Sequence, residues 1–158
     1  MMEINIEDPG KPETRALLEA SSVYMGALYP AESNHLLSVE SLQRPEVTFV
    51  VARIEERAVG CGAVVQAGAG WAELKRMFVS PAARGRKVGW RLLQKLEAIA
   101  GERGATLLRL ETGIRQPEAL ALYRSAGFVE IGPFGQYQAD PLSLFMEKPI
   151  TTATGRGV

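Results

Sequence analysis

The sequence is poor in the side chains that build disulfides and zinc sites. Its 158 residues contain one cysteine, Cys61, and one histidine, His35. A single cysteine cannot form an internal disulfide, and one cysteine with one histidine is too few for a usual zinc site. We therefore expect no metal. The first eight residues are acidic where a signal peptide would be basic and then apolar, so we expect a reduced, cytoplasmic protein.

Long apolar runs and an excess of charge of one sign are also absent. No apolar stretch approaches the roughly 20 residues that a membrane helix needs, so we expect no membrane partner. Eighteen basic residues balance 18 acidic ones to give a net charge of zero, which argues against a general nucleic-acid binder. At roughly 100–200 residues per domain, the chain predicts one domain, over residues 1–150. Residues 151–158 are small and polar, and predict a flexible tail.

Hydrophobic periodicity predicts a mixed α/β fold. Short apolar runs indicate strands, and apolar residues at helical spacing, such as Leu92, Leu93 and Leu96, indicate helices. The predicted strands are 2–6, 47–52, 58–66, 73–80, 106–111, 128–131 and 144–147. The predicted helices are 12–29, 88–100 and 117–126, with a shorter one inside 31–44 that Ser33 or Asn34 would cap. This order indicates one mixed sheet with helices on both faces.

A basic, glycine-containing turn stands between strand 73–80 and the helix that starts near Val88. Seven cations and no anion occur between Glu73 and Glu97. A helix start of this kind receives phosphate, because its backbone N–H groups are unpaired and the helix dipole adds positive charge. Glycines such as Gly85 and Gly89 let a ligand approach the backbone. The same pattern is compatible with a solvated helix face or with a nucleic-acid contact.

Two motifs carry a resemblance to a known family. The turn Arg84-Gly-Arg-Lys87-Val-Gly89 resembles the acyl-CoA pyrophosphate loop of the GNAT superfamily of N-acetyltransferases, with Lys87 where the middle glycine is usual. The segment from Gln116 to Phe128 resembles the family pattern Asn-x-x-Ala-x-x-Leu-Tyr-x-x-x-Gly-Phe, with glutamine in place of the leading asparagine. The likeness covers residues 2–148. At finer grain, segments such as 30–35, 110–113 and 133–141 resemble bacterial YsnE-type acetyltransferases.

The resemblance implies a GNAT-like, mostly antiparallel central sheet with helices on both faces and a splayed parallel strand pair that binds acyl-CoA. It implies acetyl-CoA as cosubstrate. The cofactor would pair with strand 73–79, set its phosphates on the basic turn, and contact the second motif. The residues that would bind it are Met77, Phe78, Val79, Arg84, Gly85, Arg86, Lys87, Val88, Gly89, Gln116 and Tyr123.

Acetyl transfer to an amine requires a base, a donor to the carbonyl oxygen and an acid for the leaving thiolate. The resemblance makes Tyr123 the candidate acid. Glu73 and Glu111, on the two splayed strands, are candidates for the base. The alternative is that these carboxylates are paired with neighbouring cations, namely Lys75, Arg76 or Arg109.

The resemblance places the acceptor site after the first helix and in the late loop. Its candidate residues are Glu32, Ser33, His35, Glu111, Tyr137 and Asp140. The acceptor would be a primary amine of a small molecule, amino acid or peptide. Cys61 follows a glycine on an apolar strand and is expected to be buried, so transfer would be direct, in a ternary complex. A non-catalytic acyl-CoA sensor is the alternative function, and the family leaves a homodimer open.

Overall fold

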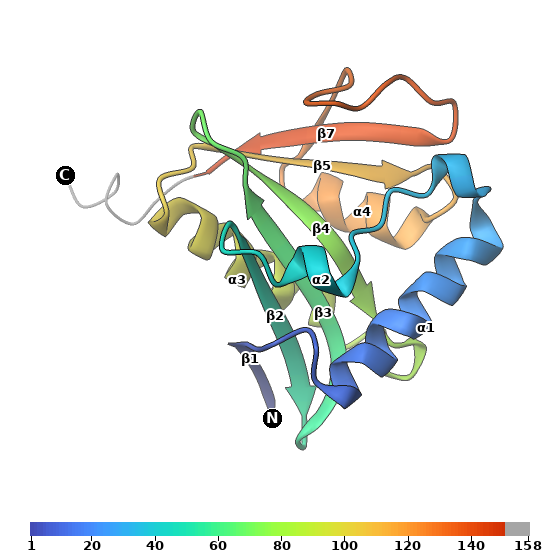
Figure 1. The fold of residues 1–158 in the computed structure, drawn as a ribbon, viewed down its shortest axis with the longest axis vertical. Helices are drawn as coiled ribbons and strands as arrows, with labels where there is room; N and C mark the ends of the chain where they lie inside the picture. Colours follow the sequence, from blue (N-terminus) through green and yellow to red (C-terminus); the bar gives the residue numbers. More distant parts are fainter. Residues whose placement is uncertain (151–158) are drawn as a thin grey trace.

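The computed structural model describes residues 1–150 and contains every helix and strand that the periodicity predicts, in the predicted order (Figure 1). The predicted tail, 151–158, lies outside the described residues. The helices are α1 (Pro12–Leu28), α2 (Val39–Leu42), α3 (Val88–Glu102) and α4 (Pro117–Ser125). The strands are β1 (Met2–Ile6), β2 (Val47–Ile54), β3 (Arg57–Gln66), β4 (Trp71–Val79), β5 (Leu107–Gly113), β6 (Val129–Ile131) and β7 (Ser143–Pro149).

The seven strands form one sheet in the order β1-β2-β3-β4-β5-β7-β6. All neighbours are antiparallel except β4 and β5, which are parallel. That pair is joined only where Trp71–Glu73 lies beside Leu107–Arg109, and Figure 1 shows the two strands diverging beyond this point. The predicted fold, including the splayed parallel pair, is confirmed. Beyond Glu73, the β5-facing edge of β4 has no strand partner in the described part of the chain.

Two apolar cores lie on opposite faces of the sheet. Successive β2 residues point to opposite faces: Val50 packs with the α3 and α4 core, and Val51 packs with the α1 and α2 core. Figure 1 shows α1 and α2 in front of the sheet and α3 and α4 behind it. Cys61 belongs to the α1 core and is fully buried, which confirms the prediction for this residue. In the part of the chain that is described, no helix has the length and apolar character needed to cross a membrane.

The predicted helix inside 31–44 is shorter and starts later than expected. Ala31–Ser33 forms a single 3-10 turn, and α2 begins only at Val39. Ser38, not Ser33 or Asn34, is its cap, because the Ser38 Oγ accepts a hydrogen bond from the Ser41 N–H at 3.1 Å. The hydroxyl of Ser33 donates instead to Asp140 at 2.7 Å. The intervening segment 34–38 is therefore non-helical and carries His35 across the sheet.

A bulge in β4 lies beside the point where the parallel pair opens. Arg76 has a left-handed backbone, with φ of 57°, and the pairing register between β3 and β4 shifts at this point. Its buried guanidinium donates to the Leu37 carbonyl at 2.6 Å and to the Leu18 carbonyl at 2.9 Å. Burial lowers the pKa of this side chain, and no carboxylate within residues 1–150 pairs with it. Arg76 thus ties α1 and the segment 34–38 to the splayed strand.

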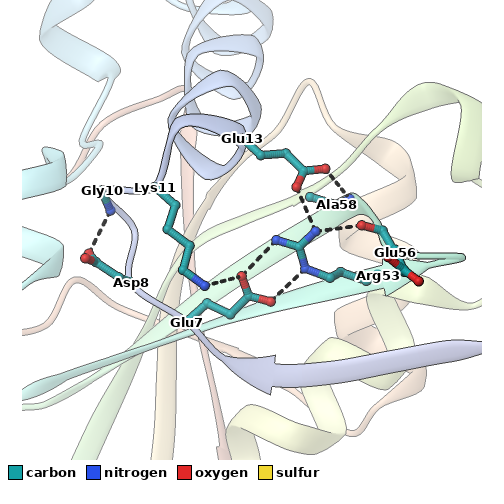
Figure 2. Close-up of polar contacts among 8 residues, drawn as sticks. All are labelled: Glu7, Asp8, Gly10, Lys11, Glu13, Arg53, Glu56 and Ala58. Atoms are coloured by element: carbon teal, nitrogen blue, oxygen red, sulfur yellow. Dashed lines mark hydrogen bonds and ion pairs between the residues drawn. The ribbon is translucent and has the colours of Figure 1, made fainter.

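A polar cluster fixes the start of α1 against the sheet (Figure 2). Arg53 of β2 donates to both carboxylate oxygens of Glu7, at 2.8 and 2.9 Å, and to Glu13 at 2.7 Å. The second oxygen of Glu13 accepts the Ala58 N–H of β3 at 2.8 Å. These contacts hold the first turn of a helix whose later turns line the site described next.

Candidate active site

A cavity of about 440 Å³ lies between the end of β4, the start of α3 and the length of α4. We call it the cofactor cavity. It brings together ten of the eleven residues predicted to bind the cofactor, whereas Arg86 does not line it. Tyr24 of α1 and Trp90 of α3 add aromatic walls. The ten are Met77, Phe78, Val79, Arg84, Gly85, Lys87, Val88, Gly89, Gln116 and Tyr123.

The basic turn has the backbone shape of an anion cradle. Gly85 and Lys87 both have positive φ, at 84° and 62°. Lys87 is the residue that precedes α3, so the family's glycine at this position is replaced by a lysine in the left-handed conformation. A Cβ added at Gly85 would meet no atom within 4 Å, which leaves the cradle open. Gly89 has a different role, because a Cβ there would lie 3.2 Å from the Leu122 side chain of α4.

Of the seven cations counted in the sequence, two line this cavity, Arg84 and Lys87, and the other five do not. Lys75 points away from it, toward the late loop, and Arg76 is buried against α1. Arg84 remains, with its guanidinium 5.4 Å from the centre of the Tyr24 ring. This cation–π contact holds a positive charge at the mouth of the cradle. The positive charge at the cofactor cavity is therefore smaller than the sequence count implies.

A small inner cavity of about 80 Å³ lies between the splayed strands. Tyr123 lines both this cavity and the cofactor cavity, so its side chain stands where the two meet. Burial raises the pKa of the Tyr123 phenol, and the Glu111 carboxylate raises it further. The phenol therefore stays protonated at neutral pH and has a proton to give.

Glu111 also lines the inner cavity, from β5. Burial raises the pKa of its carboxyl group, although the Ser143 hydroxyl, which donates to it at 2.7 Å, works in the opposite direction. A raised pKa brings a carboxylate closer to the range in which it exchanges protons at working pH. Neither Arg76 nor Arg109 pairs with it; Arg109 pairs with Glu147 at 3.0 Å.

Glu73, the other candidate base, does not line the inner cavity. It lines an outer cavity of about 750 Å³, together with Glu32, Tyr137 and Asp140 of the predicted acceptor site. The Tyr137 hydroxyl donates to Glu73 at 2.6 Å, and Lys75 lies 3.6 Å from the same carboxylate. The inner cavity holds Ser33 and Glu111 from the same predicted set. Within residues 1–150, only His35 and Lys75 line both the inner and the outer cavity.

Cys61 cannot reach any of these cavities. Its side chain is fully buried, and burial raises the pKa of its thiol to about 12. A thiol in this state is almost entirely protonated at neutral pH and is a poor nucleophile. Among the described residues, no group of three or more histidine, cysteine or acidic side chains is arranged to hold a metal ion.

Sequence reasoning missed Tyr29, the residue directly after α1. Its hydroxyl accepts the Arg115 N–H at 3.0 Å and donates to the Gln116 Oε1 at 3.2 Å. A Cβ at Gly113 would overlap the Tyr29 phenol, so the glycine at the end of β5 leaves the space that this ring occupies. Because Tyr29 engages the oxygen of Gln116, the amide NH₂ of Gln116 is left for the cavities that it lines.

Comparison with known proteins agrees with this geometry. The model of the acetyltransferase (GNAT) family matches residues 14–128. The chain belongs to the GNAT acetyltransferase family. An IAA acetyltransferase of Azospirillum brasilense is 50% identical over 145 residues, covering 91% of this chain and 95% of that protein. The uncharacterized N-acetyltransferase YsnE of Bacillus subtilis is 34% identical, covering 94% and 100%, which confirms the YsnE-type resemblance.

Solved GNAT structures share the fold. A crystal structure from Klebsiella pneumoniae, named as an acyl-CoA N-acyltransferase, has a TM-score of 0.81 at 38% identity and covers 96% of this chain and 99% of that one. An aminoglycoside 6'-N-acetyltransferase complexed with coenzyme A has a TM-score of 0.72 at 20% identity, covering 94% and 97%. The chain is thus a GNAT acetyltransferase with an acyl-CoA N-acyltransferase fold.

Proposed function

We propose that this GNAT acetyltransferase moves an acetyl group from acetyl-CoA directly to a primary amine, with both substrates bound together. The observation that carries the proposal is the inner cavity, which is lined by both Tyr123 and Glu111 and shares lining residues with two larger cavities. One of these suits the cofactor and the other the acceptor. The absence of an accessible thiol, with Cys61 buried, favours direct transfer over a covalent enzyme intermediate.

The residues of the cofactor cavity fit acetyl-CoA. The open cradle at Gly85, the first-turn N–H groups of α3 and the Arg84 guanidinium suit a pyrophosphate. The β5-facing edge of β4, unpaired beyond Glu73, suits an extended amide chain that adds like a strand. The free NH₂ of Gln116 suits a carbonyl of that chain. When bound, acetyl-CoA supplies a thioester carbonyl that is activated toward attack.

The chain's own residues then handle protons and charge. We assign Glu111 as the base that takes a proton from the amine, because it lies in the inner cavity and burial raises its pKa. Tyr123 protonates the leaving thiolate, and unpaired β4 N–H groups supply donors for the negative charge that develops on oxygen. Glu73, held by Tyr137 in the outer cavity, attracts the acceptor's cation instead.

The proposal is tested with Tyr123→Phe, measuring thiol release across a panel of amines and CoA affinity by calorimetry. We expect turnover to fall about 100-fold or more, since general acids contribute at least that much, and CoA affinity to change little. Unchanged turnover would remove the acid role of Tyr123. Binding of CoA by the wild-type protein with no thiol release on any amine would favour the non-catalytic sensor.

Glu111→Gln gives an independent check through the pH profile. The wild-type rate should fall on the acidic side through the raised pKa of Glu111, because the protonated carboxyl group cannot accept a proton. The variant should be slow at every pH and lose this acidic limb. An acidic limb that persists in the variant would assign the base to another group, with Glu73→Gln as the next variant to measure.

A further inference from the structure

The outer cavity has walls and charges that define a narrower acceptor class. Three aromatic rings meet there: Trp71 and Phe134 are edge-to-face with centroids 5.4 Å apart, and Phe134 and Tyr137 are edge-to-face at 5.2 Å. Edge-to-face contacts of this kind hold the rings in place. A rigid aromatic wall in a cavity of about 750 Å³ offers room and contact for a flat apolar body.

The lysine of this cavity is held by its neighbours. Lys75 donates to the His35 carbonyl at 2.9 Å and to the Tyr137 hydroxyl at 2.7 Å, and lies 3.6 Å from the Glu73 carboxylate, an ion-pair distance. Two of the three N–H donors of the ammonium group are therefore used in hydrogen bonds. Because Glu73 already balances the charge of Lys75, this lysine is a weak partner for a carboxylate on a bound ligand.

The acids of the cavity outnumber this lysine. Glu32, Glu73 and Asp140 line it. The Asp140 carboxylate accepts hydrogen bonds from two uncharged donors, the Ser33 hydroxyl at 2.7 Å and the Leu142 N–H at 2.8 Å. These bonds stabilise its negative charge without cancelling it. Glu32 is exposed and forms no ion pair with any residue of 1–150. The Arg109 guanidinium, which pairs with Glu147, lies 4.9 Å from the centre of the Trp71 ring and 5.8 Å from that of Phe134, so these rings already have a cation over one face. The attraction for a cationic ligand therefore comes from the excess of carboxylates, which also repels a carboxylate on the ligand.

We infer that the acceptor is a protonated amine on an aromatic body that lacks a carboxylate: an arylalkylamine rather than an amino acid. This rests on the proposed function and narrows it. The aromatic body would lie against Trp71, Phe134 and Tyr137. The amine would face Glu73 and His35, beside the partition that leads to Glu111 in the inner cavity.

The test compares tryptamine with tryptophan, which share the indole and the amine and differ by the carboxylate. We expect kcat/KM to be at least about tenfold higher for tryptamine, because like charges at close range cost that much or more. Tryptophanamide, which has the bulk without the charge, should behave like tryptamine. Ethylamine should be poorer than phenethylamine, because it lacks the ring. Equal or better use of tryptophan would overturn the inference.

Two variants of cavity residues and one control variant test whether the outer cavity causes this preference. Glu32→Gln should raise KM for tryptamine about two- to fivefold with kcat unchanged, as the loss of one exposed charge predicts. Glu19→Gln, an exposed glutamate on α1 outside all three cavities, should change neither. Tyr137→Phe keeps a ring but frees one N–H of Lys75, so it should narrow the tryptamine-to-tryptophan ratio. Equal effects of Glu32→Gln and Glu19→Gln would overturn the assignment of the cavity.

Calorimetry separates this inference from the proposed function. The protein saturated with CoA is titrated with tryptamine and with tryptophan, which needs no turnover. Preferred binding of tryptamine without thiol release would keep the acceptor class and reject the transferase activity. Thiol release that is faster with tryptophan would keep the transferase activity and reject the proposed acceptor class.

Discussion

Lys87 carries a strained backbone for its residue type. A non-glycine residue in the left-handed region costs roughly 1–2 kcal/mol, and Lys87 has φ of 62° there. Lys87→Gly should therefore raise the free energy of unfolding by up to about 1 kcal/mol, after allowance for the greater chain entropy of glycine. Urea denaturation measures this change. If the ammonium group contacts phosphate, the same variant should bind CoA more weakly.

The matched control is Lys95→Gly, the same substitution at an exposed position inside α3. Glycine in a helix interior costs about 1 kcal/mol relative to good helix formers, so this variant should lose stability where Lys87→Gly gains it. Loss of stability in both would show that the left-handed backbone at Lys87 is not a source of strain.

Tyr29 is a positioning residue for Gln116. Tyr29→Phe removes both hydrogen bonds of the phenol, to Arg115 and to Gln116, and keeps the ring. At about 0.5–1.5 kcal/mol per hydrogen bond, CoA affinity should fall about 2- to 12-fold. Calorimetric titration with CoA measures it. Tyr24→Phe is the control, since that hydroxyl has no hydrogen-bond partner among residues 1–150 and the ring beneath Arg84 is kept; matching losses would contradict the role of Tyr29.

At the scale of elements, the local hydrophobic pattern correctly predicted the helices and strands that form through local interactions. The long stripe of α3 and the alternating strands follow from side-chain periodicity, and both appear in the structure. The start and the cap of the helix inside 31–44 were predicted wrongly because Ser33 has a partner 107 residues away in Asp140, which no local signal reveals. The bulge at Arg76 was missed for the same reason, since its guanidinium bonds carbonyls of α1 and of the segment 34–38.

The cluster around Arg53 makes the start of α1 sensitive to acid. The Arg53 guanidinium lowers the pKa of Glu7, and the Ala58 N–H and Arg53 lower that of Glu13. A lowered folded-state pKa gives stability that is present above the unfolded pKa of about 4.5 and is lost as pH falls through the folded value. Arg53→Met should therefore cost about 1 kcal/mol at pH 7, with solvent screening limiting the loss.

Urea denaturation at pH 7 and at about pH 3 tests this cluster, because the wild type should lose most of its advantage over Arg53→Met at the lower pH. Arg57→Met, an exposed arginine at the start of β3, removes the same charge without these hydrogen bonds and should cost little at either pH. A constant difference between wild type and Arg53→Met across this range would contradict the account.

At the scale of the molecule, the zero net charge conceals an uneven distribution of charge between the cofactor cavity and the outer cavity. The cofactor cavity keeps Arg84 and Lys87, and the outer cavity keeps an excess of acids over one engaged lysine. The sequence predicted where cations cluster along the chain, and folding then turned Lys75 and Arg76 to other partners. Candidate residues could be named from motifs, but their partition between two cavities depends on where β4 and β5 separate.

The positive charge at the cofactor cavity predicts that the affinity of the protein for CoA depends on salt concentration. Raising NaCl from about 50 mM to about 500 mM shortens the Debye length from above 10 Å to a few ångström, so CoA affinity should fall severalfold. Arg84→Gln should bind CoA more weakly and show a shallower decline, because the cation over Tyr24 is gone. Arg103→Gln, at the opposite end of α3, should follow the wild type. Parallel salt curves for all three proteins would mean that the cradle binds CoA through its backbone N–H groups and not through the charge of Arg84.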